Sequence, residues 1–218
     1  MANQRAVIFA NGMLPDVKSA QSILKPDDFW IAADGGSSHA LACGRAPDVL
    51  IGDFDSVPEP VRDSLLRAGT KAQSYPSEKD ETDLELALRF AMDAGYSDIL
   101  ILAALGGRID QTLANLSLLG DPALQGRVVR IDDGVEEILR IEKQADVSGA
   151  PGDLVSLIPF GVPAEGVVTD GLQYPLRGET LFPFKTRGVS NRMLGKKAAI
   201  SMERGVLLCI HTHSSAGS

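Results

Sequence analysis

Short apolar segments alternate with helix-like segments over residues 5 to about 120, and this alternation constrains the fold most strongly. Each apolar segment is rich in β-branched or aliphatic residues and is followed by a polar or glycine turn. This order is typical of βαβ units, in which parallel strands form one sheet covered by helices. The expected strands are residues 6–10, 30–33, 49–52, 71–75 and 99–105.

The clearest helix is expected to begin at Thr82. Its apolar residues recur with the spacing of one helix face, at Leu84, Ala87, Leu88, Ala91 and Met92. Thr82 and Glu85 fit a capping box, and Asp83 would occupy the first turn, where the helix dipole favours a carboxylate. Gly95 is expected to end the helix.

The pattern changes beyond about residue 126, where short apolar segments lie between Gly, Pro and Asp clusters. Such a pattern favours antiparallel strands, and the prolines argue against long helices. We therefore expect an α/β domain over residues 1–126 and a small antiparallel β-sandwich over 127–218, with the boundary within 120–134. The strands expected in the second part are residues 128–131, 154–158, 167–170, 179–182, 198–201 and 206–210.

Charge and composition narrow the possible functions. The 218 residues suffice for two modest domains, and the net charge of −8 argues against nucleic acid or an anionic membrane as partner. The longest apolar run, 99–105, is far shorter than a membrane span. No signal-peptide pattern opens the chain, so a cytoplasmic location is expected. Cys43 and Cys209 have no spacing that indicates zinc or redox chemistry.

Aspartates follow four of the five expected strands of the first part. Ligands bind beyond the carboxyl ends of parallel strands, so these side chains are expected to share one cleft. The aspartates are Asp34, the pair Asp53 and Asp55, the pair Asp80 and Asp83, and Asp110.

Asp53 and Asp55 are the strongest metal candidates. On an extended backbone, residues two apart face the same side, so both carboxylates are expected to converge on one cation. Magnesium is commonly held by one or two carboxylates together with substrate phosphates. The alternative is an ordinary turn in which Ser56 and Glu59 form a capping box.

The turn at residues 106–110 permits two interpretations. Glycines 106 and 107 allow close backbone approach to a ligand, and Arg108 suits phosphate oxygens. Alternatively, Arg108 is solvated and Asp110 caps a helix. Neither GxGxxG nor GxxxxGK[ST] occurs, so carboxylate-held metal would carry much of any phosphate recognition.

Five motifs in a fixed order carry a family resemblance. They are ADGG (33–36), GDFDS (52–56), KDETDLELAL (79–88), GGRIDQTLAN (106–115) and GVSN (188–191). Together they resemble bacterial thiamine pyrophosphokinase over nearly the whole chain. The resemblance implies a nucleotide- and metal-binding α/β domain, a thiamine-binding β-sandwich and a homodimer with the active site at the subunit interface. It also implies Mg²⁺-dependent transfer of the pyrophosphoryl group of ATP to thiamine, giving thiamine diphosphate and AMP.

The resemblance also implies roles for individual residues. The metal ligands would be Asp53, Asp55 and Asp83, and Asp34 and Asp110 would line the same cleft. Lys79 and Thr82 would lie near the phosphate path, with Arg108 as the phosphate clamp. Ser190 and Asn191 would approach thiamine from the other subunit, although an ordinary Ser-Asn turn is the alternative. Asp110 is the candidate for orienting or deprotonating the thiamine hydroxyl.

Two positions depart from the family pattern. Some relatives cover thiamine with a tryptophan of the second domain, whereas Trp30 lies in an early strand. Lys79 replaces an amide side chain that some relatives have at this position.

Two rival functions are a nucleotide-sugar glycosyltransferase, which would release a nucleoside diphosphate, and a ligand sensor without turnover.

Overall fold

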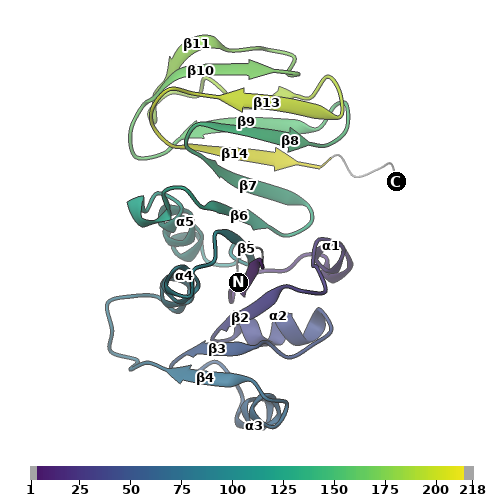
Figure 1. Cartoon of the computed structure of the whole chain (residues 1–218), viewed down its shortest axis with the longest axis vertical. Helices are drawn as coiled ribbons and strands as arrows, with labels where there is room; N and C mark the ends of the chain where they lie inside the picture. Colours follow the sequence, from purple (N-terminus) through teal and green to yellow (C-terminus); the bar gives the residue numbers. More distant parts are fainter. Residues whose placement is uncertain (1–3, 214–218) are drawn as a thin grey trace. The chain divides into compact units, whose positions relative to one another are not determined.

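The computed structural model describes residues 4–213 and divides into two compact units, residues 1–134 and 135–218 (Figure 1). The first unit alternates strands with helices, and the second consists of strands. Both fold classes predicted from the sequence, a parallel α/β part and an antiparallel β part, are confirmed.

A parallel sheet with the order β4-β3-β2-β1-β5-β6 forms the centre of the first unit. Its strands are β1 (Ala6–Phe9), β2 (Phe29–Ala33), β3 (Val49–Gly52), β4 (Lys71–Ser74), β5 (Asp98–Leu102) and β6 (Val128–Asp132). The helices are α1 (Val17–Ser22), α2 (Gly36–Ala42), α3 (Glu59–Arg67), α4 (Asp83–Asp93) and α5 (Ile109–Leu118), followed by the short 3₁₀ helix η1 (Pro122–Leu124).

Both faces of this sheet are covered, which explains its continuous apolar strands. Val7, Phe9, Leu100 and Leu102 form a buried cluster with α1 and α2 residues, whereas Ile8 faces the opposite side because side chains alternate along a strand. Helix α4 packs against β1, β2 and β3. Figure 1 shows α4 and α5 on one face of the sheet and α1 and α2 on the other.

The strand order places a topological switch beside β1. From β1 the chain adds β2, β3 and β4 on one side, and it then crosses to the other side to add β5 and β6. In open α/β sheets, ligands bind at this point, beyond the carboxyl ends of the strands. The segments that follow β1 and β5 therefore flank the expected site.

The expectation that residues 128–131 belong to the antiparallel part is wrong. They form β6, which pairs in parallel with β5 and so extends the first sheet. The physical reason is the buried, β-branched sequence of this strand, in which Val129 and Ile131 have no exposed surface. Such a segment is compatible with either kind of sheet, and its short apolar sequence does not distinguish them.

The second unit contains four antiparallel strands in the order β12-β9-β14-β7 and a four-stranded antiparallel sheet in the order β11-β10-β13-β8. One core cluster, which includes Val155, Leu157, Val167, Ile200 and Cys209, receives side chains from both sheets. The strands are β7 (Glu136–Ile141), β8 (Gln144–Ser148), β9 (Leu154–Pro159), β10 (Ala164–Asp170), β11 (Arg177–Leu181), β12 (Asn191–Arg192), β13 (Lys197–Ser201) and β14 (Leu207–Thr212).

Sequence patterning missed β7, β8 and β12. Strand β8 has the sequence QADVS, and only Val147 among its residues is buried, so its apolar signal is a single side chain. Strand β7 begins with two glutamates, and β12 has two residues. Within residues 4–213, no helix is long and apolar enough to cross a membrane.

Candidate functional site

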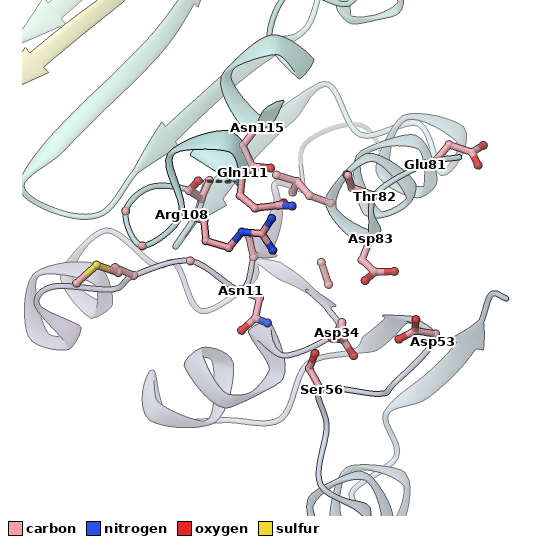
Figure 2. A pocket seen from close by; sticks show the side chains of 18 of the residues that line it. Asn11, Asp34, Asp53, Ser56, Glu81, Thr82, Asp83, Arg108, Gln111 and Asn115 are labelled. Carbon is pink, nitrogen blue, oxygen red and sulfur yellow. Dashed lines mark hydrogen bonds between the residues drawn. The ribbon is translucent and has the colours of Figure 1, made fainter. Parts of the chain in front are cut away.

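A cavity of about 590 Å³ lies at the carboxyl ends of the parallel strands (Figure 2). Its wall comes from the segments after β1, β2, β3, β4 and β5, as expected for the switch point. The polar residues that line it are Asn11, Asp34, Asp53, Ser56, Ser77, Lys79, Glu81, Thr82, Asp83, Arg108, Gln111 and Asn115.

Three aspartates from three different segments converge in this cavity. One carboxylate oxygen each of Asp34, Asp53 and Asp83 lies within 4.8 Å of the other two. Asp34 is 5% exposed, and its Oδ1 has no hydrogen-bond partner among the described residues. A buried carboxylate oxygen without a partner is costly, so this arrangement favours a bound cation.

Backbone geometry at the strand ends makes this convergence possible. Asp34 follows β2 with a φ of 46°, a left-handed conformation that is uncommon outside glycine. Gly52 ends β3 with a φ of 143°, and a Cβ atom there would lie 3.1 Å from Asp83 Oδ1. Glycine at position 52 therefore leaves space for the Asp83 carboxylate.

The extended backbone expected between Asp53 and Asp55 is not found, and a shared metal-binding role for the two stays a prediction. Phe54 between them has a φ of 68°, so the backbone is not extended. The Asp53 side chain instead accepts a hydrogen bond of 3.1 Å from the Asp55 backbone N–H, and Asp55 is exposed. Among the described residues, the cluster around Asp53 contains Asp34 and Asp83 in place of Asp55.

Lys79 contributes a positive charge to the same cluster. Its Nζ lies 2.6 Å from Asp83 Oδ1, and its side chain is 12% exposed. Burial raises the pKa of Asp83 above its ordinary value, Lys79 opposes this rise, and Asp34 and Asp53 add to it. The N–H of Asp55 lowers the pKa of Asp53. Lys79 therefore partly neutralises three carboxylates that would otherwise repel one another.

Thr82 has the capping role that its sequence context predicted. Its hydroxyl accepts a hydrogen bond of 3.2 Å from the Glu85 N–H at the start of α4. The same residue also lines the cavity. The cap fixes the first turn of α4 and with it the position of Asp83.

Arg108 lies across the cavity from the three aspartates. Figure 2 shows Arg108 and Gln111 extending from α5 on one side, with Asp34, Asp53 and Asp83 on the other. The Arg108 guanidinium donates two hydrogen bonds to Asp110, at 3.1 and 2.6 Å, and is 73% exposed. It is therefore accessible to an anion in the cavity.

Asp110 differs from its expected position. The residues that line the cavity, within the described part of the chain, do not include it, and its side chain is 61% exposed. Hydrogen bonds from Arg108 and from the Gln111 N–H lower the pKa of Asp110. A lower pKa makes a carboxylate a weaker base, so the geometry does not support Asp110 as the proton acceptor.

Ser190 and Asn191 belong to the second unit. Asn191 is 7% exposed, and its side-chain amide is occupied: Oδ1 accepts from the N–H groups of Tyr174 and Arg192, and Nδ2 donates to Tyr174 O. This supports a structural role for Asn191, which begins strand β12. Ser190 is exposed with a φ of 59°, and its N–H donates to Ser156 Oγ.

Sequence reasoning assigned no role to Asn11, Gln111 and Asn115, which line the cavity. Asn11 follows β1 in the one turn that carries no aspartate, so the strand-end rule could have found it. Asn115 is 8% exposed and its Nδ2 donates to Ala104 O at 2.7 Å, which holds the segment after β5. Gln111 lies one helical turn before Asn115 on α5.

Trp30 is not available to cover a ligand. It is 5% exposed in β2, packs against Phe9 with ring centroids 4.9 Å apart, and lies under the Arg45 guanidinium. The aromatic group that would contact a bound ring must come from elsewhere in the chain.

The donor set fits a divalent cation of the Mg²⁺ type. Oxygen ligands from carboxylates are those that Mg²⁺ prefers, and the remaining ligands normally come from water and substrate phosphates. The unpartnered Oδ1 of Asp34 and the open cavity beside it supply both a free donor and space for phosphate oxygens.

Comparisons with known proteins cover nearly the whole chain. The family model "Thiamin pyrophosphokinase, catalytic domain" matches residues 20–131, and "Thiamin pyrophosphokinase, vitamin B1 binding domain" matches residues 136–207. Thiamine pyrophosphokinase of Bacillus subtilis is 30% identical over 190 residues, which is 84% of this chain and 86% of the relative. Thiamine pyrophosphokinase 1 of Arabidopsis thaliana is 29% identical over 173 residues, 75% of this chain and 65% of the relative.

Solved structures agree. The crystal structure of the Bacillus subtilis thiamine pyrophosphokinase has a TM-score of 0.84 at 27% identity and covers 97% of this chain and 100% of its own. A thiamin pyrophosphokinase family protein from Enterococcus faecalis has a TM-score of 0.81 at 26% identity, covering 98% of this chain and 100% of its own.

Proposed function

The chain belongs to the thiamine pyrophosphokinase family, and from this premise we propose that it transfers the pyrophosphoryl group of ATP to the hydroxyl of thiamine. The hydroxyl oxygen attacks the β-phosphorus, and the bond from that phosphorus to the oxygen of the α-phosphate breaks. The hydroxyl loses its proton, and the products are thiamine diphosphate and AMP. The reaction is Mg²⁺-dependent.

The observation that carries this proposal is the pairing of opposite charges across one cavity. Asp34, Asp53 and Asp83 lie on one side and the exposed Arg108 guanidinium on the other. Transfer to a phosphorus centre requires positioning and neutralisation of charge on the phosphate oxygens, with little covalent participation by the protein.

Asp34, Asp53 and Asp83 would hold the magnesium ion. When bound, the ion supplies positive charge that offsets the charge of the phosphate oxygens. The fit rests on three converging carboxylates and on the partnerless Oδ1 of Asp34. Asp83 requires its place at the start of α4, which the Thr82 cap secures.

Arg108 and Lys79 would act on the phosphates from the protein side. Arg108 presents a planar fork suited to phosphate oxygens, and its present partner, Asp110, is exposed and readily exchanged for a substrate oxygen. Lys79 would release Asp83 and turn to a phosphate oxygen once a divalent cation takes over the neutralisation of the carboxylates. Before the substrate binds, Asp110 would hold Arg108 in place.

The second unit would contribute to thiamine binding, in line with the family model that matches residues 136–207. Its exposed Ser190 hydroxyl is a candidate contact, and the acidic character of the cavity suits the cationic thiazolium ring. We further propose a homodimer in which the two substrates meet at the subunit interface. Support comes from large apolar side chains exposed in the second unit, Tyr174, Phe182, Phe184, Val189 and Leu194.

Product analysis tests the proposed reaction. The purified chain is incubated with ATP, Mg²⁺ and thiamine, and nucleotides and thiamine phosphates are separated by chromatography. Thiamine diphosphate and AMP are expected in equal amounts, with no turnover when a chelator removes the metal. Formation of ADP would contradict pyrophosphoryl transfer, and ligand-dependent stabilisation without AMP would indicate a sensor.

A further inference from the structure

A second group of potential metal ligands lies in the second unit. One ligand atom each of Asp153, His211 and His213 lies within 4.8 Å of the other two. His211 and His213 are two residues apart at the end of β14, and Asp153 immediately precedes the adjacent strand β9. Asp153 and His211 are 58 positions apart in the sequence, and this separation concealed the group.

The group is built into the interior of the unit. Asp153 and His211 are each 1% exposed, and His211 Nε2 lies 2.9 Å from Asp153 Oδ2. The other ring nitrogen, Nδ1, has no hydrogen-bond partner among the residues that the structure describes. The His213 ring is partly buried and lies edge-on to the His211 ring, with centroids 4.3 Å apart.

The backbone of Gly149 lies close to this pair. A Cβ atom at position 149 would lie 2.5 Å from Asp153 Oδ2 and 2.7 Å from His211 Nε2. Gly149 is not among the residues with a positive φ, so its backbone conformation does not require glycine. What requires glycine at this position is the close approach of its backbone to the two ligand atoms.

Glu137 completes the arrangement from the neighbouring strand. It is the cross-strand partner of His211 in β7, and its Oε2 lies 4.0 Å from His211 Nδ1. Histidines that bind a metal through one ring nitrogen usually donate the other N–H to a carboxylate, which fixes the tautomer and the ring orientation. Glu137 faces Nδ1 and would take this role when Nε2 binds the metal.

We propose that Asp153, His211 and His213 form a binding site for a divalent transition-metal ion of the Zn²⁺ class, with Glu137 positioning His211. Two imidazoles and one carboxylate suit such ions, whereas Mg²⁺ prefers oxygen ligands alone. Ligand atoms around a tetrahedral Zn²⁺ ion are roughly 3.3–3.5 Å apart, so small side-chain rotations suffice to close the site. The ion would fix the end of β14 to the turn before β9. This inference does not depend on the proposed catalytic reaction.

The ordinary alternative is a structural His–Asp pair. It explains the contact between His211 and Asp153, and the Ala150 N–H that also donates to Asp153 at 2.8 Å. It gives no reason for His213 to join the same group. The two interpretations differ in whether His213 affects metal binding.

The test is a Zn²⁺ titration of the full chain after chelator treatment, in excess Mg²⁺ so that the aspartates of the first unit are occupied. Calorimetry is expected to show one tightly bound Zn²⁺ ion per chain, and a thermal melt a higher midpoint with Zn²⁺. With Co²⁺ as the probe, a visible absorption band should report a tetrahedral site containing nitrogen ligands.

Single-residue variants test which side chains bind the Zn²⁺ ion. His213→Gln should weaken Zn²⁺ binding by at least about tenfold while leaving the melt without Zn²⁺ nearly unchanged, and Glu137→Gln should weaken it by about tenfold. His39→Gln is the matched control, since His39 lies in the first unit and contacts Gly12 O. Absence of a bound Zn²⁺ ion in the wild-type chain, or equal binding by wild type and His213→Gln, would overturn the proposal.

Discussion

Lys79 places one positive charge beside a cluster of three carboxylates. Its ammonium group lies 2.6 Å from Asp83 Oδ1 in a site with two further carboxylates. In the absence of a divalent ion it reduces the repulsion among them. Under the proposed function, a bound divalent ion would compete with Lys79 for Asp83.

Lys79→Gln should therefore tighten divalent-metal binding. Removing one positive charge at this distance is expected to raise the affinity for Mn²⁺ by about five- to tenfold, because a partly exposed pair contributes on the order of 1 kcal/mol. Mn²⁺ titration followed by electron paramagnetic resonance measures this affinity. Lys71→Gln, on the exposed strand β4, is the control. Unchanged or weaker Mn²⁺ binding in Lys79→Gln would show that Lys79 does not compete with the metal.

Cys209 gives a prediction about burial and reactivity. Desolvation raises the pKa of its thiol to about 12, so at pH 8 almost none is the reactive thiolate. In a Cys43→Ala chain, Cys209 should react with a disulfide reagent only after unfolding. Rapid labelling of the folded chain at pH 8 would contradict its position in the core.

The same shift affects stability at high pH. The pKa of Cys209 is higher in the folded than in the unfolded chain. Its contribution to the free energy of unfolding is therefore fully present below the unfolded pKa of about 8.5 and is lost as pH rises toward 12. The free energy of unfolding should decline less steeply above about pH 8.5 in Cys209→Ala than in the wild type.

At the scale of elements, the start of α4 links stability to the site. Thr82→Ala removes the acceptor of the Glu85 N–H and should lower the free energy of unfolding by about 1 kcal/mol. It should also reduce activity, because Asp83 is the first residue of the helix. Thr82→Ser keeps the hydroxyl and is the matched control. Equal stability of the Ala and Ser variants in urea denaturation would show that the cap contributes nothing.

The elements of the first unit could be predicted well because most of its strands, among them β1, β2, β3 and β5, are buried. Strand β3 has the expected bounds, Val49–Gly52, and β1 and β2 differ from expectation by one residue. Strands of the second unit were less predictable because polar side chains dominate β8 and β7 begins with glutamates. Their pairing depends on partners far along the chain, which local patterns do not encode.

The sequence could predict which segments form the site, but not which side chains contact one another there. Asp34, Asp53 and Asp83 were expected to share a cleft because all follow parallel strands, and the structure brings them together. The left-handed conformation of Phe54, between Asp53 and Asp55, left no signal in the sequence. Nothing in the sequence indicated that Arg108 pairs with Asp110, because Asp110 was expected to face the cleft.

At the scale of the whole molecule, the proposed homodimer is directly measurable. Light scattering should give a mass twice the 23.1 kDa of the chain, because a surface with exposed Phe182 and Phe184 favours association. Phe184→Asp, at a 77% exposed position, should shift the molecule toward the monomer and lower activity. A wild-type monomer with full activity would contradict a site shared between subunits.

The proposed function is tested most directly by measuring AMP formation from ATP and thiamine over a range of Mg²⁺ concentrations. The measurement compares wild type with Asp83→Asn and Asp63→Asn. Asp63 is an exposed aspartate of α3 and serves as the control. Wild type and Asp63→Asn should form AMP and thiamine diphosphate in equal amounts, and Asp83→Asn should be slower by about 100- to 1,000-fold at every Mg²⁺ concentration. Production of ADP, or wild-type rates in Asp83→Asn, would contradict pyrophosphoryl transfer at the aspartate cluster.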